Sequence, residues 1–217
     1  KMSKKILITG STSKIARHLI KLIPKSIKVT KINSKDFKFD DLNQIKKNMN
    51  YFRQFDTIFF FHSEIGTKRL NFENIEKISR SVHTNLLSQI YISEICLKNH
   101  KKAKIFFTGS ESALKGSYDI IYSLMKASVH KYVEERKILF PDQKILCLAP
   151  STIIDSNFTK NRKDQKNVNR SIKINPKKRG LYSKEIAEII FEIMFSKKFN
   201  YLTNTIIQLN GGKFARM

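Results

Sequence analysis

Tyr122 and Lys126 are the residues whose types and spacing could carry out acid–base chemistry. They stand four positions apart in a segment of helical pattern, so a helix places the phenol and the ammonium one turn apart on one face. A free tyrosine has a pKa of about 10, and a neighbouring cation favours the phenolate and lowers that pKa. No other tyrosine of the chain has a lysine at this spacing. The pair therefore predicts a proton-transfer site in which Lys126 lowers the pKa of Tyr122.

A turn that could bind a nucleotide phosphate follows the first apolar run. Gly10 comes directly after this run, and a segment of helical period begins a few residues later. Glycine allows the tight turn, and the start of the helix offers unpaired N–H groups to a pyrophosphate. Only one of the three glycines of the dinucleotide-binding fingerprint is present, so a purely structural turn is the alternative. The residues of the turn that we expect to contact a dinucleotide are Thr9, Gly10, Ser11, Thr12, Ser13, Lys14 and Ile15.

The elements that must position these residues alternate between strands and helices. Short apolar runs predict strands over residues 6–8, 27–32, 57–61, 104–107, 144–148 and 205–209. Segments of helical period predict helices over 15–23, 42–49, 74–97, 121–139 and 183–195, the last with Ser183 as its N-cap. This alternation is typical of β–α–β units. We therefore predict an α/β fold, a Rossmann-like doubly wound parallel sheet, as a single dinucleotide-binding domain over residues 1–217.

Residues 151–181 have no clear period and are polar and basic, so we expect a flexible substrate loop or a small lid there. Lysines and arginines are concentrated between residues 160 and 179. This basic stretch is either a solvated loop or a site that attracts an anionic substrate or an acidic carrier. Nucleic acid is a third possible partner, which we do not expect. The formal net charge of +24 is otherwise spread along the chain, as a general compositional bias would produce.

In their order along the chain, the motifs resemble those of the short-chain dehydrogenase/reductase family. Thr9 and Gly10 match the start of its Thr-Gly-x-x-x-Gly-x-Gly turn, although Lys14 and Ala16 replace the second and third glycines. The other matches, which extend the resemblance over the whole chain, are Asn85, Ser110, Tyr122 with Lys126, Pro150 and Asn210-Gly211-Gly212.

The resemblance implies reversible hydride transfer between a nicotinamide cofactor and a carbonyl compound or secondary alcohol. Tyr122 would exchange the proton with the reacting oxygen, and Lys126 would lower its pKa and hold the nicotinamide ribose. Ser110 would orient the carbonyl, with Ser112 as the alternative because Ser110 precedes Tyr122 by one residue fewer than in the family. Asn85 would support a water-mediated proton path to Lys126.

The cofactor implied by the resemblance is a nicotinamide dinucleotide, and we favour NADP(H) over NAD(H). No carboxylate stands at the end of the second strand, where one would bind the 2′-hydroxyl of NAD. The family often has Asn-Asn-Ala-Gly where this chain has Phe60-Phe61-His62-Ser63, and His62 either contacts the ribose or is structural. The further cofactor-binding residues that we predict are Asn33, Ser34, Lys35, Asp40 (or Asp41), Phe61, His62, Ser63, Tyr122, Lys126, Pro150, Ser151, Thr152 and Ile153.

Two other functions are compatible with the same motifs. An enzyme of this family that modifies a nucleotide-linked sugar or a carrier-linked substrate would use the basic stretch. A non-catalytic dinucleotide-binding regulator would explain Lys14 and the missing Asn-Ala-Gly. The resemblance also implies that the protein assembles as a homodimer or homotetramer, built partly from the helices over 74–97 and 121–139.

The remaining composition narrows the setting of the protein. Cys96 and Cys147 lie in apolar segments, so we expect buried thiols and a reducing cytoplasm. The histidines have no metal-ligand spacing, so we expect no metal. No apolar run approaches the roughly 20 residues that a membrane-spanning helix needs, so we expect no membrane partner.

Overall fold

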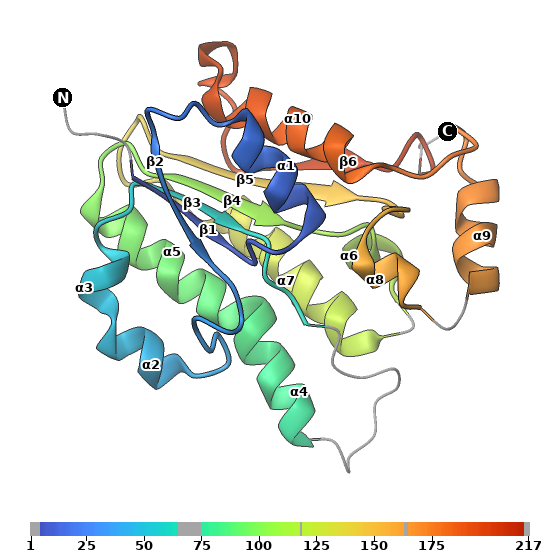
Figure 1. Cartoon of the computed structure of the whole chain (residues 1–217), viewed down its shortest axis with the longest axis horizontal. Helices are drawn as coiled ribbons and strands as arrows, with labels where there is room; N and C mark the ends of the chain where they lie inside the picture. The colour runs from blue at the N-terminus through green and yellow to red at the C-terminus, as the bar shows by residue number, and fades with distance from the viewer. Residues whose placement is uncertain (1–4, 65–74, 118, 163–164, 215–217) are drawn as a thin grey trace.

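A computed structural model describes residues 5–64, 75–117, 119–162 and 165–214 of the chain. These residues form one sheet of six parallel strands in the order β2-β1-β3-β4-β5-β6 (Figure 1). The strands are β1 (Lys5–Thr9), β2 (Lys28–Ile32), β3 (Thr57–Phe60), β4 (Lys104–Thr108), β5 (Lys144–Pro150) and β6 (Thr205–Leu209). The predicted α/β fold with a Rossmann-like, doubly wound parallel sheet is confirmed.

Helices cover both faces of the sheet. Figure 1 shows α1 (Lys14–Leu22) and α10 (Ser183–Phe195) packed together on one face, with α5 (Ser88–Asn99) and α7 (Ile120–Glu135) on the other. A π-helical turn over His83–Leu87 connects α4 (Ile75–Val82) to α5. The other helices of the described ranges are α2 (Leu42–Lys47), α3 (Met49–Phe52), α6 (Ser112–Lys115), α8 (Asn157–Lys160), α9 (Gln165–Lys173) and a 3₁₀ turn at Lys197–Phe199.

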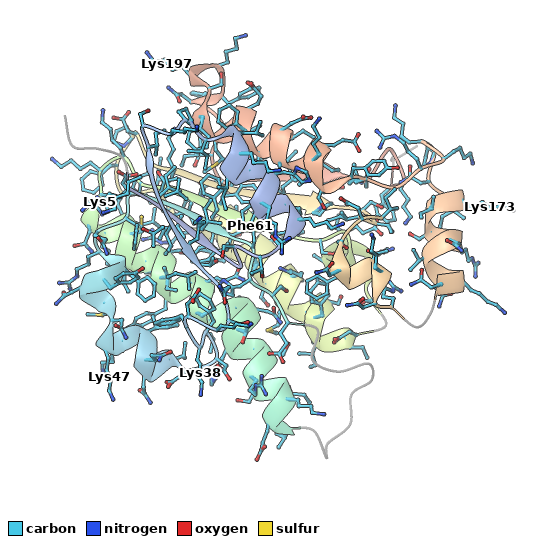
Figure 2. All side chains as sticks on the ribbon, viewed as in Figure 1. Lys5, Lys38, Lys47, Phe61, Lys173 and Lys197 are labelled. Carbon is cyan, nitrogen blue, oxygen red and sulfur yellow. The ribbon has the colours of Figure 1, made fainter. Side chains whose placement is uncertain are left out.

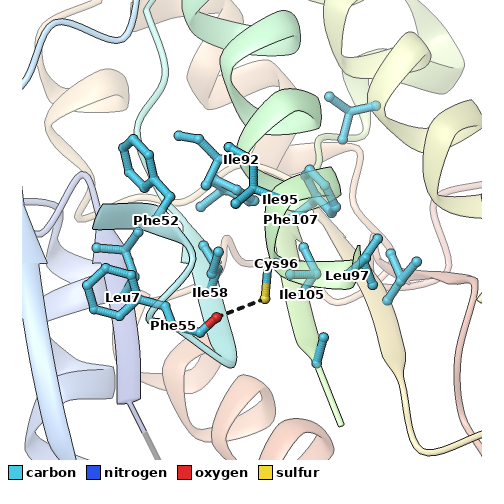
Figure 3. Close-up of a cluster of buried hydrophobic side chains, with 14 of the residues drawn as sticks. Leu7, Phe52, Phe55, Ile58, Ile92, Ile95, Cys96, Leu97, Ile105 and Phe107 are labelled. Carbon is cyan, nitrogen blue, oxygen red and sulfur yellow. Dashed lines mark hydrogen bonds between the residues drawn. The ribbon is translucent and has the colours of Figure 1, made fainter. Parts of the chain in front are cut away.

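The central strands are apolar because both of their faces are buried. Every residue of β3 and of β5 is buried. One core packs α5 and α7 against the sheet, and Figure 3 shows Cys96 within it, donating its S–H to the carbonyl of Phe55 (3.1 Å). A second core packs α1 and α10 onto the opposite face. Cys96 and Cys147 are both buried free thiols, as predicted.

Two lysines at the start of central strands contact the end of α10. Lys104 Nζ donates to the carbonyl of Met194 (2.8 Å), and Lys144 Nζ donates to the carbonyl of Ile193 (3.0 Å). The last carbonyls of a helix carry partial negative charge, so an ammonium is stabilised there. Other lysines lie around the periphery, as Figure 2 shows for Lys47, Lys173 and Lys197. In the described part of the chain, no helix has the length and apolar character that a membrane span requires.

Several element boundaries differ from those expected. The single helix predicted over 74–97 is α4, the π-helical turn and α5, which ends at Asn99, while residue 74 lies outside the described residues. The helix predicted over 42–49 is divided into α2 and α3, and α7 ends at Glu135. The N-cap of α10 is Tyr182 and not Ser183. Ser183 instead donates its N–H and its hydroxyl to Asp155 (2.9 and 2.8 Å), so this carboxylate stabilises the start of the helix.

Residues 151–181 are not the loop without regular structure that we expected. They contain α8 and α9, with residues 163–164 outside the described part. The polar sequence concealed both helices because α8 buries no residue and α9 buries only Val168. Helices that bury so little leave no apolar period in the sequence. Whether this segment acts as a substrate lid stays a prediction.

Candidate active site

The carboxyl ends of the strands open into a long cleft of about 1990 Å³. The strand order reverses at β1, which pairs with β2 on one side and β3 on the other, and ligands of doubly wound sheets bind at such a point. The predicted site residues that line the cleft are Gly10, Thr12, Ser13, Lys14, Ile15, Ser34, Asp40, Phe61, His62, Ser63, Ser110, Tyr122, Lys126, Pro150, Ser151, Thr152 and Ile153. The predicted residues outside this lining are Thr9, Ser11, Asn33, Lys35 and Asn85.

Gly10 shapes one end of the cleft. Its φ is +62°, in the left-handed region that favours glycine. A Cβ at this position would lie 2.4 Å from the backbone nitrogen of His62 and 2.5 Å from the carbonyl carbon of Phe61. The segment after β3 therefore passes so close to the β1–α1 turn that no side chain fits between them.

The N-terminus of α1 faces the cleft beside Gly10. Ser13 is the N-cap, and its hydroxyl accepts the N–H of Ala16 (3.2 Å). Lys14 is the first residue of the helix, is half-buried and lines the cleft. The pKa of Asp155 lies below its ordinary value. Burial raises this pKa, but the hydrogen bonds from Ser183 and the nearby charge of Lys14 lower it by more. Because the helix start already carries partial positive charge, the ammonium of Lys14 makes this end of the cleft favourable for an anion.

The chain after β2 forms a tight turn, and two of the predicted cofactor-binding residues, Asn33 and Lys35, belong to this turn. Asn33 Oδ1 accepts the N–H of Lys35 (2.8 Å), and Asp36 Oδ2 accepts the N–H of Asn33 (2.9 Å). The Asn33 and Asp36 side chains thus stabilise the turn, and Lys35 lies outside the cleft lining. Ser34 does line the cleft, and so does Lys38, which no motif in the sequence marked.

The ring of His62 is held by protein groups after β3. Its Nε2 lies 3.1 Å from the carbonyl oxygen of Thr84, so Nε2 carries the proton and Nδ1 accepts the hydroxyl of Thr9 (2.6 Å). Phe39 stacks on the ring with centroids 3.9 Å apart. Burial, and to a smaller extent Lys126, lowers the pKa of His62 to about 3. The imidazole is therefore neutral, and its contacts favour the structural role over the ribose contact, the two alternatives that the sequence left open.

Ser110 contacts the phenol of Tyr122. Ser110 follows β4, Tyr122 lies in the first turn of α7, and the Ser110 side chain lies close enough to the phenol to lower its pKa. Ser112 takes another position, since its N–H donates to Ser110 Oγ (3.1 Å) and its carbonyl accepts the hydroxyl of Ser123 (2.9 Å). Of the two candidate serines, the structure thus brings Ser110 to Tyr122.

The electrostatics of Tyr122 and Lys126 differ from the expectation. Burial raises the pKa of Tyr122 to about 12, against the hydrogen bond from Ser110, which lowers it, and Asp119 raises it further. Lys126 Nζ lies 5.6 Å from the centre of the Tyr122 ring and donates to the carbonyl of Thr108 (2.6 Å). Burial lowers the pKa of Lys126 to about 8. Contrary to the expectation, the pKa of Tyr122 is raised and not lowered in this geometry, because burial is the largest contribution to it.

His130 supports the backbone of Ser110 and was not predicted from the sequence. It lies one turn after Lys126 on α7, and its Nε2 accepts the N–H of Ser110 over a long 3.5 Å. Gly109, which precedes Ser110, leaves the space that the His130 ring needs. A Cβ at this position would lie 2.3 Å from His130 Nε2. Burial lowers the pKa of His130 to about 4, with a smaller contribution from Lys126.

We expect the protein to lose stability as the pH falls below about 6.5, the pKa of a histidine in an unfolded chain. With folded pKa values of about 3 for His62 and about 4 for His130, the unfolded chain binds more protons in this range. The stability that the two neutral histidines contribute is complete above pH ~6.5. It is lost as the pH falls toward their pKa values in the folded protein. Between about pH 7 and 5 the free energy of unfolding should fall by about 2 kcal/mol for each histidine.

Chemical denaturation across this pH range measures the effect. The variant His130→Gln should retain about half of the pH dependence, because only one buried imidazole remains to be protonated. An unchanged dependence in this variant would show that His130 is not one of the groups responsible.

Asn85 lies in the π-helical turn and forms hydrogen bonds with the segment after β3. Its Oδ1 accepts the N–H of Glu64 and the hydroxyl of Ser63 (both 2.8 Å), and its Nδ2 donates to the carbonyl of Glu64 (2.7 Å) and to Ser81 (2.9 Å). The side chain is fully buried. These contacts make Asn85 a positioning residue for Ser63 and Glu64, and its predicted part in a proton path stays a prediction.

Other lining residues carry no motif and were not predicted. Arg80 Nε lies 3.3 Å from Asp40 Oδ2, and its Nη2 lies 3.4 Å from Glu64 Oε1. The carboxylate of Asp40, one of the predicted cofactor-binding residues, is therefore already paired. Glu111 directly follows Ser110, and the cleft also takes in α8 and α9. The tertiary structure brings these residues to the site, Arg80 from α4 and Glu111 from the loop after β4. Within the described ranges, no three His, Cys, Asp or Glu side chains gather as a metal site.

Solved structures with the same fold are short-chain dehydrogenases/reductases. A short-chain dehydrogenase family protein from Francisella tularensis subsp. tularensis SCHU S4 is 21% identical, with a TM-score of 0.80 over 99% of this chain and 100% of that one. A 3-oxoacyl (acyl-carrier-protein) reductase from Agrobacterium tumefaciens C58 with NADP bound is 15% identical, with a TM-score of 0.78 over 96% and 93%. A 3-ketoacyl-(acyl-carrier-protein) reductase from Brucella melitensis complexed with NADH is 16% identical, with a TM-score of 0.79 over 97% and 98%.

These likenesses confirm the predicted resemblance at the level of the fold. No family model matches the sequence, and no curated protein matches it. The chain thus has the fold of short-chain dehydrogenases/reductases.

Proposed function

We propose that the protein is an NAD(P)(H)-dependent oxidoreductase of the short-chain dehydrogenase/reductase type, acting on a carbonyl compound or the corresponding secondary alcohol. The observation that carries this proposal is the contact between Ser110 and Tyr122, with Lys126 one turn away, in the same cleft as the Gly10 turn. Structural neighbours that bind NADP or NADH support it.

The described residues suit a dinucleotide. The cleft of about 1990 Å³ exceeds the roughly 300–1,000 Å³ of a typical small-molecule pocket, which leaves room for a cofactor and a substrate together. Gly10, Ser13 and Lys14, at the N-terminus of α1, would hold the pyrophosphate. Pro150 to Ile153 would lie along the nicotinamide, and Lys126 would bind its ribose. When bound, the nicotinamide supplies or accepts the hydride.

The residues around the phenol define a route for the proton. Ser110 orients a carbonyl oxygen by a hydrogen bond, next to the hydroxyl of Tyr122. Because its pKa is about 12, Tyr122 is protonated at neutral pH and can donate its proton to that oxygen as negative charge develops there. Lys126, with a pKa of about 8, is largely charged at neutral pH and stabilises the phenolate that remains.

We further propose that NADP(H) is preferred to NAD(H). Ser34 and Lys38 line the cleft after β2, and the nearby acids Asp36 and Asp40 are engaged by the turn and by Arg80. An ammonium in this position would bind a 2′-phosphate, which NADH lacks.

Titration of both reduced cofactors tests this preference together with cofactor binding itself. NADPH should bind more tightly than NADH, and Lys38→Ala should weaken NADPH binding about tenfold, the effect of one charged hydrogen bond. Lys35→Ala is the matched control, since Lys35 lies in the same turn but outside the cleft lining. Tighter binding of NADH, or equal effects of the two variants, would overturn the preference.

We also propose assembly as a homodimer or homotetramer through α5 and α7. Tyr91 and Leu124 expose 38% and 52% of their surfaces on these helices. Exposed aromatic and aliphatic side chains of this kind are typical of subunit interfaces.

A further inference from the structure

We infer that Lys213, in the segment after β6, is a positioning residue for Ser110. Its ammonium binds the carboxylate of Glu111, which directly follows Ser110 in the loop after β4. This inference rests on the proposed function, because the serine that it concerns belongs to the same site. Three observations carry it: the contacts of Glu111, the burial of the ion pair and the second contact of Lys213, with α9.

The main chain attaches the loop after β4 to the neighbouring strand. Gly109 donates its N–H to the carbonyl of Leu148 (2.8 Å), and Glu111 donates its N–H to the carbonyl of Pro150 (3.0 Å). Both bonds continue the pairing of β4 with β5. They fix the loop relative to β5, so its position relative to more distant segments depends on its side chains.

The carboxylate of Glu111 is saturated with protein contacts. Lys115 Nζ lies 2.6 Å from Oε1, and Lys213 Nζ lies 3.3 Å from Oε1 and 3.4 Å from Oε2. Burial raises the pKa of Glu111, but Lys115, Ser151 and Lys213 lower it by more. A carboxylate has about four acceptor positions, and Lys115, Ser151 and the two contacts of Lys213 fill them. Glu111 therefore connects segments of the protein and keeps no acceptor for a substrate.

Lys213 is the cation that connects Glu111 to a distant part of the chain. Lys115 stands four residues after Glu111, and 35% of its side chain is exposed, so this ion pair is local and weakened by solvent. Lys213 stands 102 residues after Glu111, and the side chains of Lys213 and Glu111 are only 5% and 7% exposed. Separating a buried ion pair leaves an unpaired charge away from water, which is strongly unfavourable. The ion pair therefore holds the loop after β4 against the segment after β6.

The same ammonium connects the loop to α9. Lys213 Nζ donates to Ser171 of this helix (2.9 Å), and the hydroxyls of Ser171 and Thr152 are hydrogen-bonded (3.0 Å). Because α9 lies at the outer edge of the molecule (Figure 1) and buries only Val168, polar contacts of this kind determine its position. Thr152 is one of the residues that we propose beside the nicotinamide. Lys213 thus joins the loop that carries Ser110 to the segment that would hold the nicotinamide.

The segment that carries Lys213 is itself held in place. The N–H of Lys213 donates to the carbonyl of Asn210 (3.3 Å), and Asn210 Oδ1 accepts the N–H of Gly212 (3.0 Å). Asn175, which follows α9, donates its Nδ2 to the same carbonyl of Asn210 (3.0 Å). The turn after β6 is therefore fixed against the end of α9, and it presents Lys213 to Glu111 from one position.

Loss of this connection should slow hydride transfer itself. Reacting atoms must lie about 3–3.5 Å apart, and a misplacement of about 1 Å can lower a rate by about 100-fold. If Ser110 shifts relative to the segment after β5, the carbonyl shifts relative to the nicotinamide. The proposed pyrophosphate contacts Gly10 and Lys14 belong to other segments, so the affinity for the cofactor should change little.

Lys213→Met tests the inference on the full chain, because it removes the charge and preserves the length of the side chain. The probe is butane-2,3-dione, a small activated dicarbonyl. Hydride transfer is followed by NADPH absorbance in a single turnover and is expressed per NADPH-binding site, which corrects for unfolded protein. We expect the rate to fall by about 10–100-fold in Lys213→Met, with a Kd for NADPH within about threefold of that of the unmodified protein. Lys102→Met, which removes an exposed ion pair with Asp142, is the control and should leave the rate unchanged.

A double-mutant cycle with Glu111→Gln shows whether Lys213 acts through Glu111. The double variant should transfer hydride no more slowly than Lys213→Met, because the ion pair is already lost in the single variant. The double variant also removes both buried charges, so it takes the place of Lys213→Met if the single variant fails to fold. Losses of rate that multiply in the double variant would mean that Lys213 acts without Glu111, and the inference would be wrong.

Hydrogen exchange of the peptide over residues 109–115 gives a readout that needs no turnover. Its amides should exchange faster in Lys213→Met than in the unmodified protein, while those of β3 should be unchanged. Unchanged hydride transfer or unchanged exchange of this peptide in Lys213→Met would overturn the inference and leave the proposed function standing. If the unmodified protein binds NADPH but reduces neither butane-2,3-dione nor any member of a panel of aldehydes and ketones, the proposed function fails and the inference fails with it.

Discussion

Replacing Tyr122 with phenylalanine should reduce kcat for carbonyl reduction by about 10²–10⁴-fold, the usual contribution of a positioned proton donor. Phenylalanine preserves the ring and its packing beside Lys126, so the variant removes only the hydroxyl that contacts Ser110. The affinity for NADPH should change little, because the exchange leaves the predicted pyrophosphate contacts Gly10, Ser13 and Lys14 unchanged. Steady-state kinetics and cofactor titration separate the two effects.

Tyr201→Phe provides the matched control, since Tyr201 is fully exposed and should not affect turnover. Full activity of Tyr122→Phe on an identified substrate would exclude the proposed mechanism. If the unmodified protein binds NADPH but turns over no carbonyl compound, a non-catalytic dinucleotide-binding protein becomes the better description.

Replacing Gly10 with alanine should destabilise the protein by about 2–5 kcal/mol and abolish cofactor binding. Two costs add: a left-handed residue with a side chain costs about 1–2 kcal/mol, and overpacking costs about 1–3 kcal/mol. The overpacking arises because the new Cβ would lie 2.4 Å from the His62 nitrogen. Chemical denaturation measures the first effect, and NADPH titration of the folded variant measures the second.

Gly116→Ala separates the two costs in the same protein. Gly116 has a φ of +82°, but a Cβ there would meet no atom within 4 Å. With a ψ of 175°, Gly116 lies in a backbone region that is almost exclusive to glycine, so its substitution should show a backbone cost without overpacking, about 1–3 kcal/mol. Equal destabilisation by the two variants would mean that the close approach of the segment after β3 does not restrict Gly10.

The pattern of the sequence was sufficient to predict the fold. Strands buried on both faces must be apolar along their length, as β3 and β5 are, and helices that cover them must repeat their apolar residues every three or four positions. Because these requirements are local, the strands and the main helices could be located from the residues alone. Short polar helices such as α8 and α9 bury almost nothing, so they remained hidden.

Tyr122 and Lys126 were predictable because their spacing lies within one helix, where four positions determine a shared face. Gly10 was also predictable from local sequence, since it stands directly after a strand. The choice between Ser110 and Ser112, the pairing of Asp40 with Arg80 and the burial of Glu111 against Lys213 required the tertiary structure. Each depends on how loops from different strands meet at one edge of the sheet, and no spacing along the chain encodes that. The raised pKa of Tyr122 also belongs to the tertiary structure, because hydration is lost only when the surrounding elements close around the phenol.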